Sequence, residues 1–204
     1  MTGHFALTSA VSVTAALIGV VLAAYGTARA ARPQTPSQGF AWMALTGVAY
    51  VLLALGAAVT DPRGEGLQAA VLQGGAVLLA AALGGLSLGR PEREASGAGT
   101  PLAGVALFFA WLSLLGLPPT AGFHARILIY RSLLQAGWSG TLTIALALGV
   151  AGLIPAFSAA SLGSPGSLRG GRAVLAVFLL IALLVVGIYP GFGLAAAGFL
   201  AGSR

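Results

Sequence analysis

The residues of this chain best able to do chemistry are His124 and Arg126, which lie two positions apart in a long apolar stretch. A guanidinium at the centre of a membrane helix costs at least about 2.5–3.5 kcal/mol, so a charge kept there is a functional candidate by default. The alternative is that Arg126 lies near a bilayer surface and extends to lipid headgroups. His124 can either relay a proton or donate a hydrogen bond to a free backbone carbonyl, and both roles stay open.

No acidic residue accompanies Arg126 in its apolar stretch. All four acids are expected in loops or at helix ends: Asp61, Glu65, Glu92 and Glu94. The counter-charge of Arg126 must then come from carbonyls, water or another subunit. Without cysteine and with only two histidines, the chain has no thiol chemistry and no self-contained metal site. We therefore predict no catalytic residue, no metal and no cofactor on this chain.

The composition is that of an all-α integral membrane protein. Of 204 residues, 58% are hydrophobic and 7% are charged, and the mean hydropathy is +0.97. Long runs without charge predict transmembrane helices, and they lack the polar–apolar alternation of a membrane β-barrel. Gly74-Gly75 and Gly84-Gly85 favour close packing between helices. We predict one membrane domain over 1–204 with about six helices, at 5–27, 39–59, 66–89, 102–137, 139–162 and 173–193.

The segment 102–137 differs from the others because it is interrupted. Pro118 and Pro119 remove two backbone donors, and Gly122 follows shortly after. The pieces on either side of the prolines are each shorter than the roughly 20 residues of a full span. We therefore favour one discontinuous crossing over two separate spans. Broken helices in membranes occur where protein or a water-filled cavity satisfies the backbone, as in ion-coupled transporters.

The basic residues are ten arginines and no lysine, spread singly or in pairs, which argues against nucleic-acid binding. With one discontinuous crossing, the loops on one side hold six arginines and the opposite loops hold Arg63 alone. With two crossings, four loop arginines lie on one side of the membrane and three on the other. Counting Arg131 and Arg204 as well gives six arginines against three, whether the segment crosses once or twice. Applying the positive-inside rule to a single crossing, we expect both termini on the non-cytoplasmic side of a bacterial cytoplasmic (inner) membrane.

Residues 112–126 read LSLLGLPPTAGFHAR, which resembles the broken-helix run LSLxGLPPxAGFxxK of the antiporter-like N subunit of respiratory complex I (NADH:quinone oxidoreductase). Three predicted helices before it and two after it agree with that family, and Tyr50 follows a stretch weakly similar to the family's His-Ala-Gly-Tyr. The resemblance implies a fold of fourteen helices with two inverted repeats, of which this chain matches the second. The missing first repeat would come from another chain, or the protein would be a reduced relative.

The departures from the family pattern argue against an autonomous proton channel. Arg126 replaces the family's lysine, and a guanidinium does not release its proton. A second family lysine has no counterpart, because 33–39 carries no charge, and the serine/histidine cluster is replaced by 41–46.

The resemblance implies a non-redox membrane-arm subunit of an NADH:quinone oxidoreductase-like complex, contributing to proton translocation coupled to quinone reduction. Its expected partners are the other membrane subunits of such a complex and the lipid bilayer, with Arg126 and His124 on the proton pathway and Pro118, Pro119 and Gly122 forming the break. The alternatives are a non-conducting structural subunit and a component of a cation/proton antiporter.

Overall fold

A computed structural model describes residues 2–32, 35–61, 63–88, 100–157 and 165–189, together with Gly191 and Ala195. The named elements in this part of the chain are all helices. They are α1 (Thr2–Ala30), α2 (Pro36–Ala58), α3 (Glu65–Ser87), α4 (Pro101–Leu115), α5 (Ala121–Gln135), α6 (Ser139–Ala151), α7 (Leu153–Phe157) and α9 (Gly171–Ile188).

Four stretches are long and apolar enough to cross a bilayer on their own: Ala10–Ala30 of α1, and helices α2, α3 and α9. Their outer surfaces are apolar as well. Leu78 and Val174, for example, are each 72% exposed. Many other large apolar side chains of α1, α6 and α9 are exposed as well, and extensive apolar surface of this kind is typical of helices that contact lipid. The chain is an all-helical integral membrane protein.

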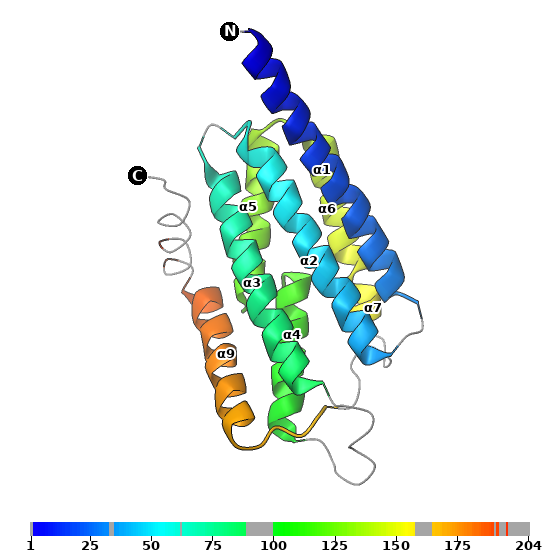
Figure 1. The fold of residues 1–204 in the computed structure, drawn as a ribbon, viewed down its shortest axis with the longest axis vertical. Coiled ribbons are helices and arrows are strands. Elements are labelled where there is room, and N and C mark those ends of the chain that lie inside the picture. The colour runs from blue at the N-terminus through cyan, green and yellow to red at the C-terminus, as the bar shows by residue number, and fades with distance from the viewer. Residues whose placement is uncertain are drawn as a thin grey trace.

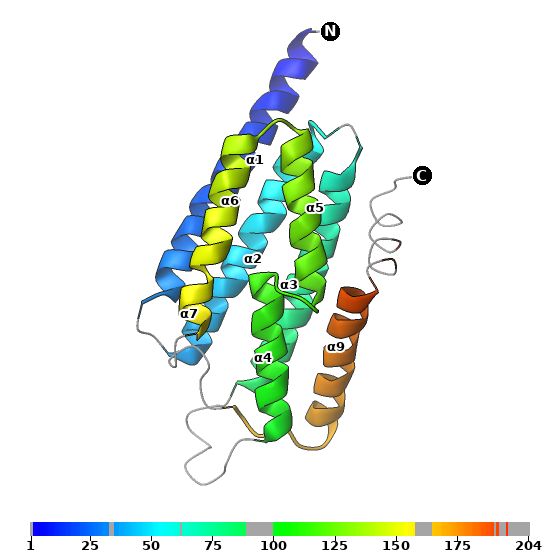
Figure 2. The ribbon, with the colours of Figure 1, turned by 180° about the vertical axis from the view of Figure 1, so that it is seen from behind.

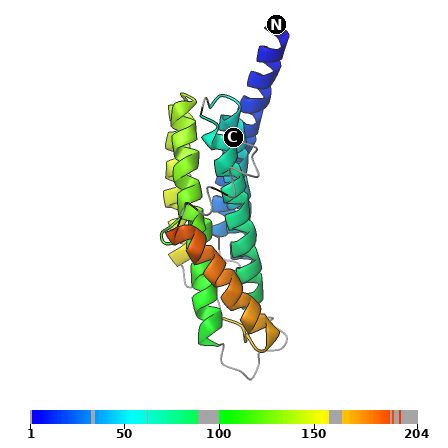
Figure 3. The same cartoon turned by 90° about the vertical axis from the view of Figure 1, so that its left-hand side faces the viewer.

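The helices form two layers (Figures 1 and 3). Helices α1, α2 and α3 lie side by side in one layer, and α5, α6 and α4 form the second. Helix α3 contacts both α4 and α5, while α9 packs against α3, α4 and α5 at one edge. The second layer therefore contains the interrupted segment, and α2 and α3 cover it from one side.

Helices α4 and α5 together make one discontinuous crossing. In Figure 2 α4 runs from one end of the bundle to its middle, and α5 continues from there to the opposite end. Each has 15 residues, or about 22 Å of helix, which is less than the hydrocarbon core of about 30 Å. Neither piece spans alone, and the two in succession do. The preference for one crossing over two is confirmed.

The helix boundaries follow local signals that refine the predicted ranges. Pro36 and Pro101 are first-turn prolines preceded by Thr35 and Thr100, so α2 starts earlier than the predicted 39. The expected helix 139–162 is divided into α6 and α7 at Gly152, and its last residues lie outside the described part of the chain.

Small residues bring α1 and α2 into close contact. A Cβ added at Gly19 would lie 2.9 Å from the Ala49 carbonyl oxygen, and one at Gly56 would lie 2.9 Å from that of Ser12. Among the glycines of α3 the expectation of close packing is right for Gly84, whose added Cβ would meet the Phe40 ring at 2.2 Å. An added Cβ at Gly74, Gly75 or Gly85 would meet nothing within 4 Å among the described residues, so these three glycines do not pack closely against another described helix.

Candidate functional site at the broken helix

The break begins where α4 ends at Gly116, which has the positive φ of 70° that favours glycine. The Leu117 N–H donates to the Leu112 carbonyl at 2.9 Å, which closes the helix in the manner of a Schellman motif. The turn continues through a cis Pro118–Pro119 peptide bond, and the Thr120 hydroxyl donates to the Leu117 carbonyl at 2.7 Å. The prolines thus form the connection between the two half-helices.

Gly122 allows the start of α5 to cross the end of α4 at very short range. A Cβ added at Gly122 would lie 1.9 Å from the Ser113 carbonyl oxygen, so no larger residue fits without moving the backbone. On the other side of the break, an added Cβ at Gly187 of α9 would lie 2.0 Å from the Pro119 carbonyl oxygen. The absence of a side chain at Gly122 and Gly187 therefore allows α4 and α9 to pack directly against the break.

Arg126 lies one turn into α5 and is buried, with 3% of its surface exposed. Its Nη2 donates to the Leu114 carbonyl in the last turn of α4 at 2.9 Å. That carbonyl is at the end of a helix, where the dipole is negative and carbonyls lack helical partners. A cation is favourable there, so the guanidinium caps α4 from within α5.

The face of the guanidinium is covered by Tyr50 of α2. The guanidinium carbon lies 3.4 Å from the centroid of the Tyr50 ring, well within the range of a cation–π contact. The Tyr50 hydroxyl donates to the Ala145 carbonyl of α6. Tyr130 lies edge-on to Tyr50, with ring centroids 6.4 Å apart. Helices α2, α4, α5 and α6 thus meet around Arg126, and sequence reasoning had not placed either tyrosine there.

No carboxylate within the described residues neutralises Arg126. The only salt bridge in this part of the chain joins Arg131 to Glu65. The Nε and Nη1 groups of Arg126 have no hydrogen-bond partner among the described residues. The buried charge is compensated by the α4 carbonyl and the electron-rich ring face. Because arginine stays protonated, it acts as a fixed positive charge at this position.

His124 points away from Arg126. Two positions along an α-helix correspond to a rotation of about 200°, so the two side chains lie on nearly opposite faces of α5. His124 is half-buried and contacts the Phe123 ring, and its Nδ1 has no hydrogen-bond partner among the described residues. The structure therefore does not bring these two predicted site residues together.

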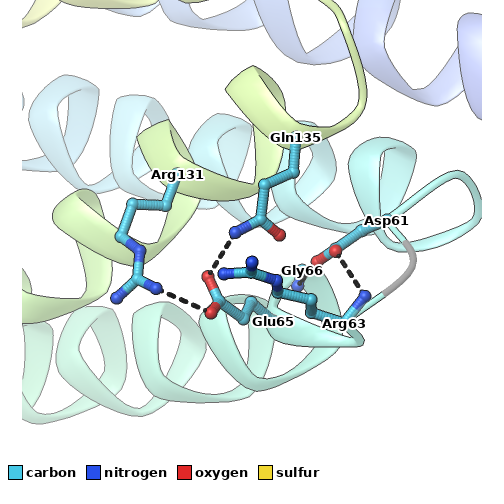
Figure 4. Close-up of polar contacts among 6 residues, drawn as sticks. All are labelled: Asp61, Arg63, Glu65, Gly66, Arg131 and Gln135. Atoms are coloured by element: carbon cyan, nitrogen blue, oxygen red, sulfur yellow. Dashed lines mark hydrogen bonds and ion pairs between the residues drawn. The ribbon is translucent and has the colours of Figure 1, made fainter.

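The opposite end of α5 is tied to the start of α3 by polar contacts (Figure 4). Arg131 Nη2 lies 2.9 Å from Glu65 Oε1, and Gln135 Nε2 donates to Glu65 Oε2 at 3.4 Å. Asp61 accepts from the backbone N–H groups of Arg63 at 2.9 Å and Gly66 at 2.8 Å. The two Glu65 contacts fix the outer end of α5, and the Asp61 contacts stabilise the start of α3 to which α5 is joined.

A bundle of apolar helices, with one crossing interrupted near the middle of the bundle and a charge at the interruption, is an architecture that ion-coupled transport proteins use. No protein-family model matches the chain. It is 37% identical over 108 residues to NADH-quinone oxidoreductase subunit 14 of Thermus thermophilus, a partial homology covering 47% of this chain and 24% of that protein.

Solved structures match over nearly the whole chain. A chain of respiratory complex I from Thermus thermophilus with bound aureothin matches with a TM-score of 0.59 and 26% identity, covering 90% of this chain and 45% of that one. A chain of the Mrp complex from Dietzia sp. matches with a TM-score of 0.68 and 18% identity, covering 95% and 47%. A chain from a second structure, respiratory complex I from Thermus thermophilus with bound NADH, matches with a TM-score of 0.64 and 22% identity. The match covers 95% of this chain and 44% of that one. The chain spans less than half the length of the proteins it matches.

Proposed function

We propose that this chain is a membrane-arm subunit of an NADH:quinone oxidoreductase-like complex and contributes to proton translocation coupled to quinone reduction. The observation that carries the proposal is the buried Arg126 at the break between α4 and α5, without a carboxylate partner among the described residues. The partial identity to a complex I subunit supports the same assignment. The partners are then the other membrane subunits of that complex.

Arg126 acts in this proposal as an electrostatic barrier and not as a proton carrier. A fixed positive charge raises the energy of a proton 8 Å away by about 2 kcal/mol at an effective dielectric constant near 20. A barrier of this height slows passive leakage along the break by roughly thirtyfold. Protons cross only when another charge in the assembly offsets the guanidinium, which couples their movement to changes in the neighbouring subunits.

We propose an orientation in the membrane from the distribution of the described charges. Arg29, Arg32, Arg169 and Arg172 lie at the bundle end where α1 finishes and α9 starts. At the other end the charged groups of Figure 4 include both signs and balance. By the positive-inside rule, the arginine-rich end faces the cytoplasm of a bacterial cell and both termini face the opposite side.

The test is Arg126→Ala in the assembled complex in inverted membrane vesicles. Proton uptake and quinone reduction are measured together, each driven by NADH. We expect the number of protons moved per NADH oxidised to fall while the complex remains assembled. Unchanged stoichiometry in an intact complex would exclude the proposed role.

Arg131→Ala is the matched control. It removes the same side chain from the same half-helix, but Arg131 is 51% exposed and pairs with Glu65 at the bundle end. We expect its proton stoichiometry to equal that of the unaltered complex. An equal loss in both variants would indicate a general disturbance of α5.

Two other functions have specific support. A non-conducting structural subunit is favoured by the replacement of an exchangeable amine with a guanidinium. In that case Arg126→Ala would change assembly and leave the proton stoichiometry unaltered. A component of a cation/proton antiporter is favoured by the fold match to the Mrp complex chain. In that case Arg126→Ala would change cation-driven proton movement in vesicles without NADH.

A further inference from the structure

The guanidinium of Arg126 makes two different contacts at once. In its plane, Nη2 donates to the Leu114 carbonyl at 2.9 Å. Against its face, the Tyr50 ring lies 3.4 Å from the guanidinium carbon. A planar, delocalised cation satisfies both contacts together, whereas a compact ammonium group does not stack. The surroundings of residue 126 are therefore shaped for arginine.

We propose that Tyr50 is the positioning residue of Arg126, and that its ring face supplies the electrostatic compensation that no described carboxylate provides. By this inference Tyr50 keeps the guanidinium over the α4 end and prevents it from turning toward lipid. The inference rests on the proposed function for its effect on proton pumping. The placement of the guanidinium itself can be tested independently.

Tyr50 is held rigidly enough for this role. It is fully buried, and its hydroxyl is bound to the Ala145 carbonyl of α6. The α6 backbone approaches closely at Gly149, where an added Cβ would lie 3.2 Å from the Tyr130 hydroxyl and 3.5 Å from both the Tyr50 hydroxyl and Arg126 Nη1. The ring is thus enclosed by α6 on its hydroxyl side and by Arg126 on its face.

The experiment measures the reactivity of Arg126 with phenylglyoxal, an arginine reagent, in membranes containing the full-length protein. Adducts on the peptides containing Arg126 and Arg131 are quantified by mass spectrometry. Arg131 is 51% exposed and serves as an internal reference, while Arg126 is buried. We expect Arg126 to be protected from the reagent in the unaltered protein. We expect Tyr50→Leu to raise the Arg126 adduct by about tenfold, since a desolvated cation–π contact is lost.

Two further variants separate the ring from its surroundings. Tyr50→Phe keeps the ring, and we expect Arg126 to stay protected within about twofold, as loss of the hydroxyl leaves the cation–π contact in place. Tyr130→Leu makes the same substitution beside the site at a ring that is not under the guanidinium, and Arg126 should again stay protected. If Tyr50→Leu does not accumulate in membranes, Tyr50→Met provides the same loss of the ring with a flexible side chain.

Unchanged protection of Arg126 without the Tyr50 ring would overturn the inference. So would equal exposure of Arg126 in the phenylalanine and leucine variants, or in the Tyr130 variant. In the same membranes we expect proton pumping to fall in Tyr50→Leu and to be retained in Tyr50→Phe. If Arg126→Ala leaves pumping unaltered, the proposed function fails, and the adduct pattern still decides the role of Tyr50.

Discussion

The substitution Gly122→Ala should disrupt the break between α4 and α5 by displacing one helix from the other. The added Cβ would lie 1.9 Å from the Ser113 carbonyl oxygen, whereas carbon–oxygen contacts in proteins are about 3.3 Å or longer. Both atoms belong to backbone or are fixed to it, so the two half-helices must separate by about 1.4 Å. Leu114 follows Ser113, and Arg126 lies one turn after Gly122. The same movement therefore stretches the 2.9 Å contact between Nη2 and the Leu114 carbonyl beyond hydrogen-bond range.

Overpacking of this kind costs about 1–3 kcal/mol, which lowers the melting temperature of a chain of this size by roughly 3–10 °C. The assay is thermal unfolding of the purified protein in detergent, together with the proton stoichiometry in vesicles. Gly75→Ala is the control, because an added Cβ there meets no described residue within 4 Å and alanine is favoured over glycine in helices by up to about 1 kcal/mol. A melting temperature for Gly122→Ala equal to that of Gly75→Ala would refute the reasoning.

Three further outcomes are expected. Asp61→Ala removes the acceptor for two backbone N–H groups at the start of α3. It should lower the free energy of unfolding by about 0.5–2 kcal/mol, and Asp61→Asn should recover part of that loss. Equilibrium unfolding and hydrogen exchange measure both effects. Glu65→Gln breaks the ion pair with the half-exposed Arg131 and should change the free energy of unfolding by no more than about 1 kcal/mol, less at high salt. A larger effect would show that this contact is not the weak surface pair described. Gly187→Ala places a Cβ 2.0 Å from the Pro119 carbonyl oxygen and should detach α9 from the break. Faster proteolysis of α9 is the expected result, and an unaltered rate of cleavage would contradict the prediction.

The amino-acid sequence alone determined the class of protein and the place of the break. Charge-free runs require helices in lipid because the backbone there has no other hydrogen-bond partners. Pro118 and Pro119 lack backbone donors, so interruption of the helix at that point is a local property of the chain. The glycine at 116 with its positive φ and the threonine–proline starts of α2 and α4 are likewise local. These features needed no knowledge of neighbouring helices.

Only the tertiary structure decided what surrounds Arg126. The helices are apolar on nearly all sides, so no polar stripe indicates how each one is rotated about its axis. That rotation is set by contacts between helices, such as Gly122 against Ser113. It turns Tyr50 of α2 onto the guanidinium of Arg126. The partners of a buried charge therefore depend on packing between segments distant in sequence, because local hydrophobicity specifies burial but not orientation.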